Sequence, residues 1–124
     1  MSEALTRALC QIDGVMEASS AFKDGPAFWV NGTEIAHFEG DSAIDIRLTK
    51  VEIRARRADL RADARVSLRA SGSDWLTVEF GGPEDERFVC DLAEIAAAAH
   101  RPADGSAPRL PPSGADLARR RRFH

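Results

Sequence analysis

Two hairpin signals between Phe28 and Leu48 constrain the fold of this chain more than any other feature of its sequence. The Asn31-Gly32 pair favours a two-residue type I′ turn, because both central residues of that turn need positive φ. The Gly40-Asp41 pair fits a type II′ turn, which takes glycine at its first central position. Together they predict three consecutive antiparallel strands and fix which side chains share a face of the sheet.

The predicted register divides these strands into an apolar face and a polar face, since side chains alternate along a strand. The second turn would pair His37 with Ile44, which places His37 on the apolar face. A third hairpin is predicted to pair Val66 with Val78 and Leu68 with Leu76. The polar face then collects Trp29, Glu34, Phe38, Asp45, Arg47, Arg69 and Trp75.

Three helices are predicted from their end signals. The first runs from Ser2 to about Ile12 and stops at Gly14. The second begins with a capping box of Thr49 and Glu52. Its narrow apolar stripe would consist of Val51, Ala55, Ala58 and Ala62. We therefore expect an α+β fold of two layers, with an antiparallel sheet of about five strands, the order α-β-β-β-α-β-β-α and the helices on one face.

The third helix opens with Pro83 and ends before Pro102. Its end marks the expected domain boundary. Residues 1–101 should form one globular α+β domain, whereas residues 102–124 hold four of the six prolines and few large apolar side chains. We expect that second segment to be a disordered basic tail, because it cannot offset the entropy of ordering. It ends in Arg119, Arg120, Arg121 and Arg122.

The sequence has no apolar run near the roughly 20 residues that a membrane span needs, and its first residues lack the features of a signal peptide. A cytoplasmic location without a membrane span is therefore expected. The two cysteines, Cys10 and Cys90, fall in helical patterns, so we expect buried reduced thiols. Phosphate-loop and nucleophile-elbow motifs are missing, and no cofactor is predicted.

Three segments, AFWVNGTEIAHFEG, DIRLTK and SDWLTVEF, resemble the luciferase-domain family of small bacterial proteins. The resemblance covers about residues 14–100. It implies a compact, uncharacterised α+β domain, and it implies very little about light emission or monooxygenase chemistry. Members of the family often carry a second histidine after the Ala-His-Phe strand, where this chain has Glu39.

The polar face is the first candidate site, because exposed tryptophan is scarce unless a ligand, a partner or a further segment covers it. Five of its residues would bind a small anionic ligand or a protein, a second copy of the chain included. Arginine would grip a carboxylate or phosphate while an indole ring stacks on the rest of the ligand. These residues are Trp29, Asp45, Arg47, Arg69 and Trp75. The alternative interpretation of Arg47 is an exposed ion pair with Glu34 across the strands.

Two further hypotheses belong to other classes of protein. The chain could be an enzyme that uses His37 as an acid–base group assisted by Glu39 or Asp45, or as a metal ligand with Glu39 and Asp41. Against this, a single histidine on an apolar face is usually a packing residue. A nucleic-acid-associated protein would instead use the arginine-rich second helix and the basic tail.

Overall fold

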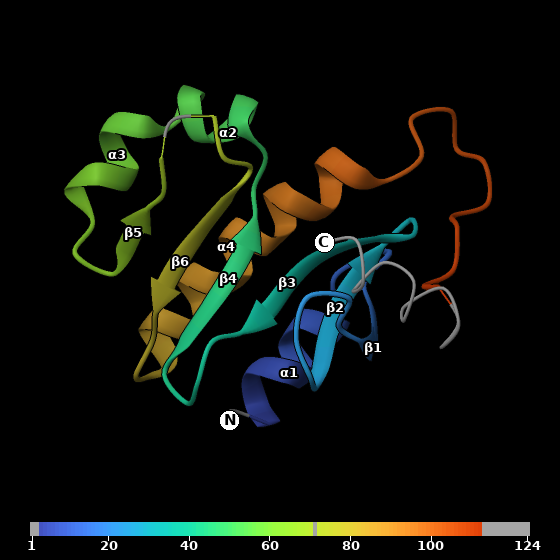
Figure 1. The fold of residues 1–124 in the computed structure, drawn as a ribbon, viewed down its shortest axis with the longest axis horizontal. Helices are drawn as coiled ribbons and strands as arrows, with labels where there is room; N and C mark the ends of the chain where they lie inside the picture. The colour runs from blue at the N-terminus through green and yellow to red at the C-terminus, as the bar shows by residue number, and fades with distance from the viewer. Residues whose placement is uncertain (1–2, 71, 113–124) are drawn as a thin grey trace.

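The structure is a computed structural model that describes residues 3–70 and 72–112. Its centre is an open, antiparallel, six-stranded sheet in the order β1-β2-β3-β4-β6-β5 (Figure 1). The strands are β1 (Met16–Ser19), β2 (Pro26–Val30), β3 (Thr33–Phe38), β4 (Ala43–Arg47), β5 (Val66–Leu68) and β6 (Trp75–Glu79). The helices are α1 (Glu3–Cys10), α2 (Lys50–Ala55), α3 (Arg57–Ala62) and α4 (Pro83–His100).

The predicted α+β class is confirmed, with two differences in its elements. A sixth strand, β1, pairs antiparallel with β2 at one edge of the sheet. It is short and mostly exposed, so its sequence carries little of the alternation that marks a strand. The predicted second helix is divided at Arg56, whose backbone leaves the helical region at φ −112° and ψ 14°.

All four helices contribute to one apolar core against the sheet. Helix residues such as Leu5, Leu60 and Leu92 meet strand residues such as Ile44 and Leu76 there. Burial of a side chain of this size contributes about 1.5–3 kcal/mol. This core is the main source of stability, and it leaves the opposite face of the sheet free for polar side chains.

The break at Arg56 also makes the predicted apolar stripe of the second helix wrong. The structure buries Ile53 and Leu60, whereas Val51 is 68% exposed, and the three alanines of the stripe are exposed as well. A stripe with one helical period cannot persist across two short helices that are out of phase. The capping box itself is confirmed, because Thr49 Oγ1 accepts a hydrogen bond from the Glu52 amide at 3.3 Å.

The third hairpin has the predicted register, and the second does not. The first has it at Val30–Thr33 and Trp29–Glu34 but loses it at Phe28, which pairs with Ala36. Asn31 and Gly32 both have positive φ and join Val30 to Thr33. The third hairpin pairs its residues as expected. In the second, Phe38 pairs with Ile44, because residues 39–42 form a longer loop than a two-residue turn. This register moves Phe38 into the core and turns His37 to the opposite face.

The described part of the C-terminal segment, residues 102–112, contains neither helix nor strand. It leaves α4 and returns to the turn between β2 and β3 (Figure 1), where the Arg109 amide donates to Asn31 Oδ1 at 2.8 Å. The four arginines expected to contact nucleic acid, at positions 119–122, lie outside the described residues.

Among the described helices, none combines the length and apolar character needed to cross a membrane.

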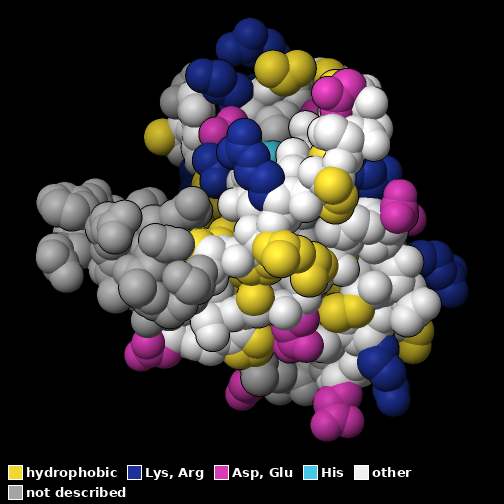
Figure 2. Space-filling model, turned by 90° about the vertical axis from the view of Figure 1, so that its right-hand side faces the viewer, with side chains coloured by type: hydrophobic (Ala, Val, Ile, Leu, Met, Phe, Trp, Pro, Cys, Tyr) yellow, Lys and Arg dark blue, Asp and Glu magenta, His cyan; other side chains and the backbone are white. Residues whose placement is uncertain are grey.

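Cys10 and Cys90 are free and half-buried, and burial raises the pKa of both thiols. Both therefore remain protonated and poorly nucleophilic near neutral pH. Figure 2, a view toward the β1 side, shows several Lys and Arg side chains on the upper part of this face, with acidic ones among them, and apolar side chains near its middle.

Candidate functional site

The sheet face opposite the core is covered in part by the loop between β1 and β2. Ala21 from this loop, with Ala27 and Trp29 of β2, forms a second, smaller apolar cluster. Trp29 is only 1% exposed in consequence. It was expected to contact a ligand on this face, and the loop closes it off. The remainder of the face carries the polar side chains of β3, β4 and β6.

A β-bulge in β3 brings Glu34 and His37 onto this polar face together. Trp29 pairs with Glu34 while Phe28 pairs with Ala36, so Ile35 is the additional residue. Residues three apart on a regular strand would point to opposite faces. The bulge and the long loop after β3 place His37 beside Asp45, where the sequence predicted a core position.

His37 lies between two buried carboxylates. Its Nδ1 is 2.8 Å from Glu34 Oε2, and its Nε2 is 3.1 Å from Asp45 Oδ2. The two carboxylates are 2% and 3% exposed as residues, and His37 is 7% exposed. Since a carboxylate accepts hydrogen bonds, this geometry satisfies both ring nitrogens only when both carry a proton.

Neighbouring groups hold each carboxylate in place. Glu34 accepts the Ser20 hydroxyl and the Ala21 amide, both at 2.6 Å. Asp45 accepts the Thr77 hydroxyl at 2.6 Å, and Arg69 Nη2 lies 3.0 Å from Asp45 Oδ2. The result is a hydrogen-bonded network, here called the His37 network, that consists of Ser20, Glu34, His37, Asp45, Arg69 and Thr77.

The electrostatics of the network favour a charged imidazolium. Burial opposes protonation of His37, but hydrogen bonds to Asp45 and Glu34, together with their negative charges, outweigh it and raise the pKa above the ordinary 6.5. Burial likewise acts to raise the pKa of Asp45, yet the hydrogen bonds from His37 and Thr77 and the charge of Arg69 lower it well below its usual range. Both shifts favour an imidazolium at His37 paired with a carboxylate at Asp45.

The network forms the floor of a pocket of about 430 Å³. This pocket, here called the Trp75 pocket, is lined by Phe22, Lys23, His37, Glu39, Asp45, Arg69 and Trp75. Its aromatic groups contact one another: the ring centroids of His37 and Trp75 are 5.0 Å apart, and those of Phe22 and Trp75 are 5.5 Å apart. Lys23 Nζ pairs with Glu39 at 2.7 Å.

A divalent cation would find three ligand atoms here, although not the predicted set. Atoms of His37, Glu39 and Asp45 lie within 4.8 Å of one another, so Asp45 takes the place that the sequence hypothesis gave to Asp41. Glu39 is already paired with Lys23, and Asp45 with Arg69. His37 itself is held as an imidazolium between two carboxylates. A metal would have to deprotonate His37 and displace Lys23 and Arg69, so the charge arrangement opposes a cation.

The remaining predicted residues are divided between the pocket and its surroundings. Trp75 lines the pocket. The Arg47 guanidinium lies over the same indole, with its Cζ 5.7 Å from the ring centroid, and its Nη2 is 3.9 Å from Asp74 Oδ2. Arg47 therefore supports Trp75 from outside the pocket lining. The predicted ion pair between Glu34 and Arg47 is wrong, because the bulge directs Glu34 to His37.

Sequence reasoning missed Ser20, Phe22, Lys23 and Thr77. The first three belong to the loop between β1 and β2, whose position over the sheet depends on a strand that was not predicted. Thr77 lies between Trp75 and Glu79 in β6 and pairs with Asp45. Pairing β4 with β6 at the sequence level would have placed its hydroxyl on the polar face.

A comparison of the sequence with protein-family models found no match, and neither did a comparison with curated proteins. The fold and the site alone define the class of this protein: an α+β domain with an open antiparallel sheet and a buried histidine–carboxylate network on the face opposite its core.

Proposed function

We propose that this chain is a binding domain for a small anionic ligand and that the Trp75 pocket is its ligand site. One observation carries the proposal: His37, held between Glu34 and Asp45, forms the floor of that pocket. A buried ionic network costs more desolvation free energy than a packed apolar floor would. Groups with shifted pKa values in a pocket are frequent markers of a functional site.

The walls and rim of the pocket indicate the chemistry of the ligand. Phe22 and Trp75 provide aromatic surface for an apolar or ring-shaped part. Arg69 contacts Asp45 through Nη2, and its guanidinium has further donors that can pair with a carboxylate or phosphate. Lys23 adds a second cation at the rim. A small molecule with one anionic group and one planar group suits this arrangement best.

We also propose that the chain belongs to the luciferase-domain family. The segment that carries the resemblance runs through β2 and β3 and includes Glu34 and His37, so the proposed family and the proposed site share residues. A reducing, cytoplasmic location is part of the same proposal, supported by the free thiols of Cys10 and Cys90.

Tryptophan fluorescence tests the binding proposal. Titration with a panel of small aromatic and aliphatic carboxylates should change the emission of Trp75, and Trp75→Phe should remove the response. Arg69→Gln removes a charged partner, so at least one ligand should bind about tenfold more weakly. Arg47→Gln is the matched control, because Arg47 stacks near the same indole but does not line the pocket. An equal loss in both variants, or no response to any member of the panel, would overturn the proposal.

An acid–base enzyme is the second candidate. The observation that favours it is the position of the two carboxylates that hold the ring. Asp45 lines the pocket together with His37, whereas Glu34 does not line it and lies behind the ring. Opening the longer bond to Asp45 would expose Nε2–H to a bound molecule, and Glu34 would hold the ring in place. The imidazolium would then serve as a general acid.

Turnover separates these two candidates. Any carboxylate that binds can be incubated with the protein and followed by proton NMR. A binding domain leaves the ligand unchanged. An enzyme consumes it, and His37→Gln should then abolish consumption while the ligand still binds. Consumption that is unaffected by His37→Gln would exclude this role for His37.

A further inference from the structure

A second pocket lies between the two short helices and the loop that joins β5 to β6. We propose that this pocket binds a phosphate dianion, either free or at the end of a small phosphomonoester, through Lys50, Arg54 and Arg57. It is distinct from the Trp75 pocket, although Arg69 and Trp75 stand between the two and line both. The proposal does not depend on the function assigned to the Trp75 pocket.

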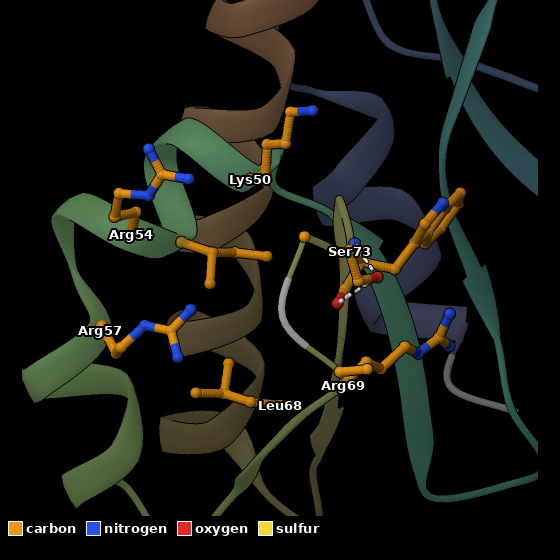
Figure 3. A pocket seen from close by; sticks show the side chains of 10 residues that line it. Lys50, Arg54, Arg57, Leu68, Arg69 and Ser73 are labelled. Atoms are coloured by element: carbon orange, nitrogen blue, oxygen red, sulfur yellow. Dashed lines mark hydrogen bonds between the residues drawn. The ribbon is translucent and has the colours of Figure 1, made fainter.

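The lining of this pocket has an unbalanced charge. Four of its ten residues are basic and none is acidic: Lys50, Arg54, Arg57 and Arg69 accompany Ile53, Leu68, Ala70, Gly72, Ser73 and Trp75. Figure 3 shows Arg57 pointing across the pocket toward Leu68, with Lys50 and Arg54 at its edge. The guanidinium of Arg69 points out on the other side, where it contacts Asp45. Three cationic groups therefore remain at this opening.

Neighbouring acids do not neutralise these three groups. Among the described residues, Glu52 pairs with Arg56. Asp74 accepts the backbone amide of Lys50 at 2.9 Å and lies near Arg47. No ion pair of the described residues includes the side chains of Lys50, Arg54 or Arg57. The three cationic groups line one pocket that has no acidic lining residue, and a bound anion would supply a counter-charge to them.

The size of the pocket restricts the ligand to a small group. The cavity volume is about 40 Å³, against about 430 Å³ for the Trp75 pocket. It can receive part of a tetrahedral oxyanion but not a sugar or a base. Guanidinium groups match phosphate oxygens in geometry, and lysine adds a point charge. Ile53 and Leu68 give one side of the pocket an apolar lining, where charge–charge contacts are less screened by water.

Isothermal titration calorimetry with inorganic phosphate and with glycerol phosphate tests the proposal. The wild-type protein should bind at least one of them in the millimolar range. Arg57→Gln removes a charge-assisted contact and should weaken binding about tenfold. Arg54→Gln, at an exposed position, should weaken it as well, and this variant keeps the test valid if Arg57→Gln fails to fold.

Arg61→Gln is the matched control, because Arg61 is exposed on α3 and does not line the pocket. It should leave phosphate affinity unchanged. An equal loss in Arg61→Gln would show a general charge effect and would overturn the proposal, as would the absence of heat with both phosphates. Tight binding of a single-stranded oligonucleotide without binding of either phosphate would indicate a nucleic-acid surface instead. Arg57→Gln should not alter the carboxylate response of the Trp75 pocket.

Discussion

At the scale of single residues, His37 is the group on which the site depends. Its pKa is raised in the folded protein, so folding favours the protonated ring. The stability this provides is fully present below about pH 6.5, the ordinary value for histidine, and is lost as the pH rises through the higher folded pKa. We expect the free energy of unfolding to fall across that interval.

Urea denaturation at a series of pH values measures this effect. The wild-type protein should lose stability on the alkaline side of pH 6.5, and His37→Gln should show a flatter dependence there. On the acid side the lowered pKa of Asp45 acts in the opposite direction: its contribution is present above about pH 3.8, the ordinary value, and is lost as the pH falls toward the folded pKa. An identical alkaline slope in both proteins would contradict the assignment.

Glu34 provides a second prediction at this scale. Glu34→Gln keeps the shape of the side chain and removes the charge that partners the imidazolium. Removing one member of a buried ion pair leaves the other uncompensated, so we expect a loss of about 3 kcal/mol in the free energy of unfolding. The loss should be smaller when His37→Gln is also present. Glu79→Gln, at an exposed position of β6, is the control and should change stability little. Similar effects at Glu34 and Glu79 would argue against a buried network.

At the scale of elements, the sequence identified most helices and strands but not the register that builds the site. Turn chemistry correctly placed the Asn31-Gly32 hairpin, because only a few residue types tolerate two successive positive φ values. It could not reveal the bulge at Ile35, since both Ile35 and Ala36 are apolar and either one could face the core. One additional residue in β3 decides whether His37 is a packing residue or the floor of a pocket.

The start of α2 offers a prediction at the same scale. Thr49 caps this helix with its hydroxyl while its backbone has φ +85°, a conformation that favours glycine. Thr49→Ala loses the cap and should destabilise the protein by about 1 kcal/mol. Thr49→Gly also loses the hydroxyl but adopts the positive φ without strain, so it should be the less destabilising change. Urea denaturation of both variants checks this order, and the reverse order would show that the backbone strain is unimportant.

At the scale of the whole molecule, the predicted division at residue 101 can be tested by truncation. The described residues 102–112 contact the body of the protein at Asn31 and Gly32, whereas Arg101 still ties the end of α4 to the backbone of Asp13 at 2.8 Å. A chain that ends at Arg101 should therefore unfold cooperatively. We expect the truncation to lower the free energy of unfolding by about 1 kcal/mol at most. For a domain of this size, that corresponds to a fall in melting temperature of less than about 8 °C. Loss of cooperative unfolding would show that the domain boundary lies beyond residue 101.

The central claim is that the Trp75 pocket, with a charged His37 at its floor, binds a small anion. NMR titration of the full chain with a carboxylate from the fluorescence panel tests it most directly. The imidazole signals of His37 should show both ring nitrogens protonated at neutral pH, and these signals and the indole N–H of Trp75 should shift together on titration. In Arg69→Gln, the same shifts should need about tenfold more ligand. A neutral imidazole, or ligand-induced shifts that spare both His37 and Trp75, would contradict the account.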